Sequence, residues 1–197
     1  MIRRTFSRSP RLAALVGATV VACASSCGNL TGVPASLPTK SDSGLVYAIN
    51  GAPPGAPSTL HVFSGTLQPA NANFAFDVAF DIDANGDVVV LPQRAVASGL
   101  ATTHTVGLQT VTTSYDALTS APRSGYRADT ALVTTVNRVI IVQSQDANAC
   151  GVSLTGTTLY AKIVVTAVDL RARQLTLKYT TDPNCGFFSF ASGLPKD

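Results

Sequence analysis

The segment Asp81–Asp87 is the part of this sequence whose residue types and spacing most directly suggest chemistry, and that chemistry would be calcium binding. Oxygen donors stand at alternate positions and a glycine takes the sixth, as in a twelve-residue calcium loop: Asp81, Asp83, Asn85, Gly86 and Asp87. The twelfth position, which needs a bidentate glutamate, is Pro92. Because Asn-Gly is also a strong signal for a tight hairpin turn, we interpret the segment as a turn and predict no metal site.

Catalytic groups are sparse. His61 and His104 are the two histidines, and neither has a neighbour at metal-ligand spacing, so we expect both on the surface or on an edge strand. The sequence contains no Gly-x-Ser-x-Gly, His-Glu-x-x-His, phosphate-loop or dinucleotide-binding motif. We therefore predict a protein that is not an enzyme and needs no cofactor. An extracytoplasmic hydrolase is the alternative, since catalytic groups need not be contiguous in sequence.

Positive charge is concentrated at the start of the chain. The formal net charge is +3, and the first 22 residues hold four arginines and no acidic residue, so the net charge without them is −1. A near-neutral surface offers no positive patch for a phosphate backbone, which argues against nucleic-acid binding. Only 13% of the residues are charged while 46% are hydrophobic, a composition that favours a secreted, β-rich protein.

Residues 1–22 have the pattern of an export signal. A basic segment ends at Arg11, and the apolar segment Leu12–Ala22 is too short to span a bilayer. This apolar segment runs into Val20-Val21-Ala22-Cys23, which resembles the lipobox of bacterial lipoproteins. The resemblance implies that Cys23 is diacylated, that the chain is cut before it, and that the new amine is acylated, which gives a lasting anchor. With Ala24 next, it further implies the outer membrane of a two-membrane cell.

Two other interpretations of this segment remain open. Ala22-Cys23-Ala24 also satisfies the small-x-small rule of ordinary secretory cleavage, and a cut after Ala24 would release a soluble protein. Arg3-Arg4-Thr5-Phe6 resembles part of a twin-arginine export signal, although Ile2 stands where serine or threonine is usual.

The rest of the chain is predicted to form one all-β domain after a tether. Residues 23–43 are predicted to be a lipidated, flexible tether, because Gly, Ser, Thr and Pro dominate from Gly28 onward. Residues 44–197 are predicted to be a single antiparallel β-sandwich or barrel-like domain. Short runs rich in Val, Ile, Phe, Tyr and Thr mark its strands: 45–50, 60–67, 73–83, 87–97, 104–113, 130–144, 157–169 and 173–181.

Two hairpins are predicted in detail. In the first, Phe74, Phe76, Val78, Phe80 and Ile82 share one parity and face the core, while Asp77, Asp81 and Asp83 share the other and face solvent. A type I′ turn at Asn85-Gly86 would place Ile82 opposite Val89. In the second hairpin, residues 169–173 make the turn, and the apolar parity is that of Leu175, Leu177 and Tyr179.

The cysteines divide into two groups. With Cys23 acylated and Cys27 in the tether, Cys150 and Cys185 remain within the domain, each in a polar turn and each followed by glycine. In an oxidising compartment a disulfide between them is favoured over free thiols or metal ligands. It would hold the tail, with Phe187, Phe188 and Phe190, against the ends of the sheets. For Cys27, a free thiol, an intermolecular bond and an alternative acylation site stay open.

Three segments resemble envelope lipoproteins of soil bacteria that have no known activity: Gly125–Thr130, Tyr160–Lys162 and Asp182–Phe187. This resemblance implies a class and no activity. The sequence thus predicts a membrane-tethered, extracytoplasmic β-sandwich lipoprotein that acts as a binding or structural module of the cell envelope. Its partners would be the membrane, through the lipid anchor, and an envelope protein or small ligand. A small-ligand-binding protein, a hydrolase and a secreted soluble protein are the alternatives.

Overall fold

The computed structural model describes residues 34–70, 75–97, 104–151, 153 and 155–195. Within these residues the chain forms eleven strands and two short helices: β1 (Lys40–Tyr47), β2 (Thr59–His61), β3 (Thr66–Gln68), β4 (Val78–Ile82), β5 (Val88–Pro92), α1 (Gln93–Val96), β6 (His104–Val111), β7 (Arg127–Ala128), β8 (Leu132–Thr134), β9 (Val139–Asp146), α2 (Ala147–Cys150), β10 (Thr158–Asp169) and β11 (Gln174–Asp182). Among the described helices, none has the length and apolar character needed to cross a bilayer. The predicted signal, residues 1–22, lies outside the described residues.

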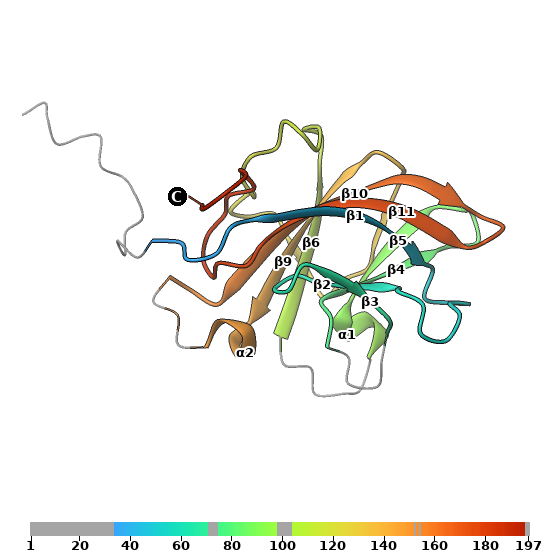
Figure 1. Cartoon of the computed structure of the whole chain (residues 1–197). Helices are drawn as coiled ribbons and strands as arrows, with labels where there is room; N and C mark the ends of the chain where they lie inside the picture. Colours follow the sequence, from blue (N-terminus) through green and yellow to red (C-terminus); the bar gives the residue numbers. More distant parts are fainter. Residues whose placement is uncertain (1–33, 71–74, 98–103, 152, 154, 196–197) are drawn as a thin grey trace, which may run out of the picture.

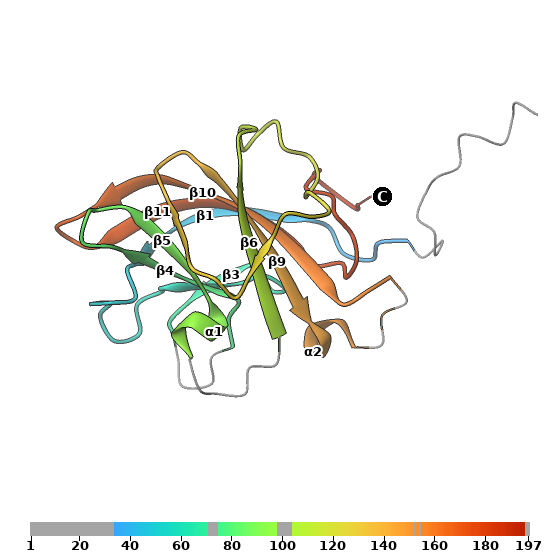
Figure 2. The same ribbon diagram turned by 180° about the vertical axis from the view of Figure 1, so that it is seen from behind.

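The strands form two antiparallel sheets that pack as a sandwich, which confirms the predicted fold class. One sheet has the order β1-β11-β10-β9-β6-β7 and the other β3-β2-β4-β5-β8. Figures 1 and 2 show the long strands β10 and β11 beside β1 in one layer, with β4 and β5 in the layer facing it. Side chains from both layers fill the space between them, and the largest include Phe80, Leu60, Leu108, Ile140, Ile163 and Leu177. This packing follows from the period-two alternation of apolar residues along the strands.

The hairpin of β10 and β11 agrees with its prediction. Leu175, Leu177 and Tyr179 are buried, while Thr176 and Lys178 between them are exposed. In the turn, the carboxylate of Asp169 accepts hydrogen bonds from two successive backbone N–H groups, which is how aspartate stabilises tight turns.

The hairpin of β4 and β5 forms, but its predicted register is wrong by one residue. Ile82 pairs with Val88 and not with Val89. Gly86 alone in this loop has a positive φ, at +86°, so the loop has three residues and is not a type I′ turn. The cause is Asp83, whose Oδ1 accepts hydrogen bonds from the backbone N–H groups of Asn85 and Asp87 and thereby holds the wider loop.

The prediction that the second face of this strand is exposed to solvent is also wrong. Asp77 is 1% exposed and Asp81 is 8% exposed. Asp81 is covered by Arg173, whose Nη2 lies 2.9 Å from its Oδ1, and by a hydrogen bond from Asn50. All five residues of β4 are buried, and the contacts of Asp81 come from Arg173 and Asn50, distant partners that alternation in a single strand does not reveal.

Two predicted strands are each divided by a turn. Within 60–67, the N–H of Gly65 donates to the carbonyl of His61, so the chain reverses and β2 pairs with β3. Within 130–144, a turn at residues 135–138 takes the chain from β8 in one sheet to β9 in the other, with Asn137 at a φ of +66°. The β-branched residues on both sides of each turn give a continuous strand pattern, which conceals the turn.

Part of the predicted tether belongs to the structured head. β1 begins at Lys40, and the backbone N–H groups of Ser36 and Leu37 both donate to Oδ1 of Asn184 at 3.0 Å. The Nδ2 of Asn184 in turn donates to the carbonyl of Leu37 at 2.7 Å. These partners come from the other end of the chain, so the local composition of residues 34–43 gives no sign of them.

The outer face of the six-stranded sheet carries a second apolar cluster. Segments before β7 and after β11 cover it, and its buried members are Tyr115, Ala121, Val139, Ile141, Tyr160, Val164 and Phe190. Lys162 is buried in the same region, with its Nζ donating to the carbonyls of Tyr115 and Leu118 at 2.7 and 2.8 Å. The C-terminal tail therefore packs with Phe190 on a face of the sheet, and the prediction that it closes the sheet ends is wrong for this ring.

The predicted disulfide is present. Cys150, at the end of α2, is bonded to Cys185, which follows β11, and their Cα atoms are 5.7 Å apart. The bond joins residues 35 apart in sequence and should stabilise the fold by about 3 to 4 kcal/mol through loop entropy. The next residue, Gly186, has a φ of +83°, and a Cβ atom there would lie 2.1 Å from the carbonyl oxygen of Thr155, so only glycine fits. The disulfide indicates an oxidising, extracytoplasmic compartment.

Candidate functional site

Two of the acidic residues considered as calcium ligands have other partners. Asp83 is bonded to its own turn and Asp81 to Arg173. In the described ranges, no three His, Cys, Asp or Glu side chains lie close enough to hold a metal ion. His61 is half-buried, with its Nδ1 2.9 Å from Oγ of Ser64. The disulfide pair, Cys150 and Cys185, lies together as predicted, whereas Cys23 and Cys27 fall outside the described residues.

A buried polar cluster that the sequence did not predict centres on Asp77, just before β4. Its Oδ2 accepts a hydrogen bond from the backbone N–H of Val62 at 2.6 Å. Its Oδ1 accepts a hydrogen bond from the hydroxyl of Ser144 in β9 and lies 3.3 Å from Nε2 of His104 in β6. The carboxylate thus contacts both sheets at once.

The prediction of a surface or edge-strand location for His104 is wrong. His104 is 7% exposed. It lies in β6 opposite Asp146 of β9. Burial lowers the pKa of His104, but the hydrogen bond and charge of Asp77, together with the charges of Asp146 and Asp129, raise it above its usual value. Burial raises the pKa of Asp77, yet its bonds to His104 and Ser144 lower it below its usual value.

The cluster has the residue types of a serine hydrolase without the geometry of one. In a catalytic triad, the imidazole lies between the nucleophile and the carboxylate, where it can accept the proton of the hydroxyl. Here the carboxylate of Asp77 lies between Ser144 and His104, and Ser144 is fully buried. The arrangement can join the two sheets, and it pairs the hydroxyl of Ser144 with a carboxylate of lowered pKa, which is a weak base, and not with the imidazole.

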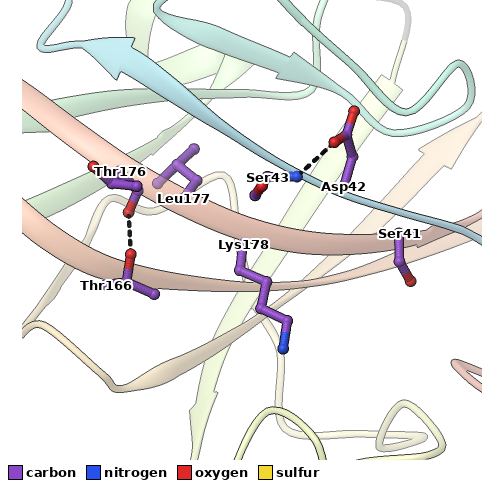
Figure 3. Close-up of a pocket in the computed structure, with 7 residues that line it drawn as sticks. All are labelled: Ser41, Asp42, Ser43, Thr166, Thr176, Leu177 and Lys178. Atoms are coloured by element: carbon purple, nitrogen blue, oxygen red, sulfur yellow. Dashed lines mark hydrogen bonds between the residues drawn. The ribbon is translucent and has the colours of Figure 1, made fainter.

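One open feature of the described part of the sandwich is a groove of about 480 Å³ on the outer face of β1, β10 and β11. Its lining, drawn in Figure 3, consists of Ser41, Asp42, Ser43, Thr166, Thr176, Leu177 and Lys178. Four of the seven residues are serine or threonine, and two side chains of the lining are bonded to neighbouring backbone: Thr166 Oγ1 to the carbonyl of Thr176 at 3.2 Å, and Asp42 Oδ1 to the N–H of Ser43 at 2.7 Å.

One rim of the groove is fixed by charge and by hydroxyl groups. The Nζ of Lys178 lies 2.7 Å from Oδ1 of Asp116 and 4.7 Å from the ring centre of Tyr115. The hydrogen bond and charge of Lys178 lower the pKa of Asp116. Behind this pair, the hydroxyl of Thr180 contacts those of Ser41 and Tyr115 at 2.8 and 2.7 Å. Burial raises the pKa of Tyr115 to about 12, so its phenol stays protonated at neutral pH.

This lining suits binding. Its outward side chains present hydroxyls and one paired ammonium, while Asp42 projects to the other side of β1, and none of the lining residues is a histidine or cysteine. Sequence reasoning missed it because Ser41 and Ser43 fell in the predicted tether and the other residues form no motif. Strand pairing alone brings them together, through the register of Ser43 with Lys178 and of Leu45 with Thr176.

Comparison with protein-family models, with curated protein sequences and with solved structures found no match to this chain. The chemistry of its own groove and buried cluster therefore provides the grounds for a functional proposal.

The Asp77–His104 pair predicts a specific dependence of stability on pH. Folding raises the pKa of His104 above 6.5, its value in the unfolded chain. The contribution of His104 to the free energy of unfolding is therefore complete below pH 6.5 and is lost as the pH rises through the folded pKa. The pKa of Asp77 is lowered below 3.8, its value in the unfolded chain. Its contribution to the free energy of unfolding is present above pH 3.8 and is lost as the pH falls through the folded pKa. Urea unfolding should show the free energy of unfolding declining as the pH rises above 6.5, and His104→Gln should flatten that decline. Equal slopes in both proteins would contradict the assignment.

Proposed function

We propose that this protein is a lipoprotein of the cell envelope whose β-sandwich acts as an extracytoplasmic binding module. The observation that carries the proposal is the groove over β1, β10 and β11, which is open and lined with hydroxyl groups. The buried cluster that has catalytic residue types lacks catalytic order, which supports binding over hydrolysis. The proposal of a tethered protein is supported by the lipobox resemblance at Cys23 and by a disulfide that suits an oxidising compartment.

The chemistry of the lining favours a polar, uncharged chain, such as a glycan strand of the envelope. Ser41, Ser43 and Thr176 present hydroxyls that can both donate and accept hydrogen bonds. Lys178 is paired with Asp116, so it offers little net charge to an anionic ligand. A groove across neighbouring strands can follow an extended ligand over several repeating units, which suits a polymer better than a compact small molecule.

The anchor is tested by Cys23→Ser, which should move the protein from the membrane fraction to the soluble fraction or block its maturation. Cys27→Ser is the matched control and should leave the protein in the membrane. Mass spectrometry of the wild-type N-terminus should find acylated Cys23 there. An unmodified N-terminus at residue 25 would contradict the anchor and indicate secretory cleavage after Ala24.

The groove is tested by NMR titration of the purified protein with soluble fragments of envelope glycan. Amide resonances of Ser41, Ser43 and Thr176 should shift on addition. Thr176→Trp, which fills the groove, should weaken binding at least tenfold, or about 1.4 kcal/mol. Val133→Trp is the control, because Val133 is 56% exposed on β8 of the other sheet. If the groove amides do not move at millimolar glycan, or if Thr176→Trp binds as wild type does, the groove is not the binding site.

A further inference from the structure

One end of the sandwich is built from segments far apart in the sequence. Asn184 binds the backbone at Ser36 and Leu37, the N–H of Thr39 donates to the carbonyl of Gly193 at 2.9 Å, and the disulfide ties the end of α2 to the same region. Figure 1 shows the start of the described chain, α2 and the C-terminal tail at this end, and the turn between β10 and β11 at the opposite end. We call this end the proximal face and define it by four segments: Pro34–Thr39, Ala147–Gly151, Pro183–Phe187 and Gly193–Pro195.

The four segments of the proximal face are uncharged and partly apolar, while the exposed Lys40, which follows the first segment, donates from Nζ to the carbonyl of Ser64 at 2.9 Å, and Lys196 and Asp197, which follow the last, lie outside the described residues. None of its four segments contains Asp, Glu, Lys or Arg, although 13% of the whole chain is charged. The acidic residues directly before two of the segments, Asp146 and Asp182, are 7% and 0% exposed. Two leucines of the face protrude into solvent, Leu37 at 42% and Leu194 at 56% exposure.

A pocket of about 250 Å³ opens on this face. Its lining is largely apolar and includes the disulfide: Pro34, Leu37, Phe63, Cys150, Cys185 and Phe187 are among its residues. An uncharged face with protruding leucines can enter the headgroup region of a bilayer without burying an unpaired charge, whose transfer would be costly.

The length of chain before the face limits where the face can go. Ten residues, 24–33, separate Cys23 from Pro34, which makes eleven Cα-to-Cα steps. At about 3.6 Å per residue, they span at most roughly 40 Å when fully extended, and a relaxed flexible chain of this length has an end-to-end distance of roughly 20 Å. Because the chain joins the head on the proximal face, this is the face that a short anchor keeps nearest to the bilayer.

We propose that the proximal face rests on the lipid bilayer, with Leu37 and Leu194 inserted at the level of the headgroups. This inference rests on the proposed function, since acylated Cys23 supplies the tether. With the protein already anchored, the contact of two leucines becomes an intramolecular step at high effective concentration, so weak insertion is sufficient. The contact would fix the head on the membrane and leave the distant β10–β11 turn pointing away from it.

The chain contains no tryptophan, so single tryptophans can report contact with lipid. Leu194→Trp places one on the proximal face, and Leu170→Trp places a control in the β10–β11 turn, where Leu170 is 60% exposed. The acylated full chain would be reconstituted in vesicles of phosphatidylcholine and phosphatidylglycerol with brominated phospholipid as quencher. Fluorescence of the Leu194→Trp protein should fall by at least half, and that of the Leu170→Trp protein by less than a tenth. Adding Leu37→Glu should reduce the quenching of Leu194→Trp.

Flotation of the same vesicles separates failure of this inference from failure of the proposed function. Protein that does not float with the vesicles has no working anchor, and both proposals are overturned. Protein that floats but shows equal quenching of the two reporters keeps its anchor, and only the bilayer contact is overturned. Unquenched Leu194→Trp together with a dimer that Leu37→Glu dissociates would also overturn the contact and assign the face to a second copy of the chain.

Discussion

A single buried carboxylate bonds to both sheets, in addition to the apolar core that fills the space between them. Asp77 takes its hydrogen bonds from Val62 on the five-stranded side and from Ser144 on the six-stranded side, and it lies against His104 of β6. Its own backbone also joins neighbouring elements, through the carbonyl of Leu60 and the N–H of Gln93 at the start of α1. A carboxylate without partners in such a place would cost several kcal/mol. A shift of register in any strand that carries a partner would leave this carboxylate or a buried donor unpaired.

Lys162 has the corresponding role on the other face of the six-stranded sheet. Burial lowers its pKa, and two backbone carbonyls and the ring of Tyr115, 4.4 Å away, compensate for the loss of water. These contacts hold the covering segment over β10. The covered part of the sheet is thereby rigid and inaccessible, and the uncovered part, over β1 and the neighbouring strands, carries the groove. The contacts of Lys162 thus help to determine which part of this face is covered.

The features that the sequence predicts are those whose interacting residues lie close together along the chain. Alternation within one strand and turns between adjacent strands are local, so the buried parity of β11 and the hairpin of β10 with β11 were predicted correctly. The pairing of Cys150 with Cys185 was also predictable, because few cysteines were available. Asp77 was assigned to solvent because its parity opposes that of Phe76, and its partner Ser144 lies 67 residues away. Groove residues Ser41 and Ser43 were missed because only their pairing with β11 orders them.

The claim that Asp77 couples the sheets is tested most directly by a double-mutant cycle with Ser144, its partner in β9. Free energies of unfolding would be measured in urea for Asp77→Ala, Ser144→Ala and the double variant, with the disulfide intact. Asp77→Ala should lower the free energy of unfolding by about 3 kcal/mol, because it leaves buried donors without an acceptor. The double variant should cost less than the sum of the single variants by about 1 to 2 kcal/mol. Strict additivity of the two losses would contradict the account, because the sheets would then not be joined through this carboxylate.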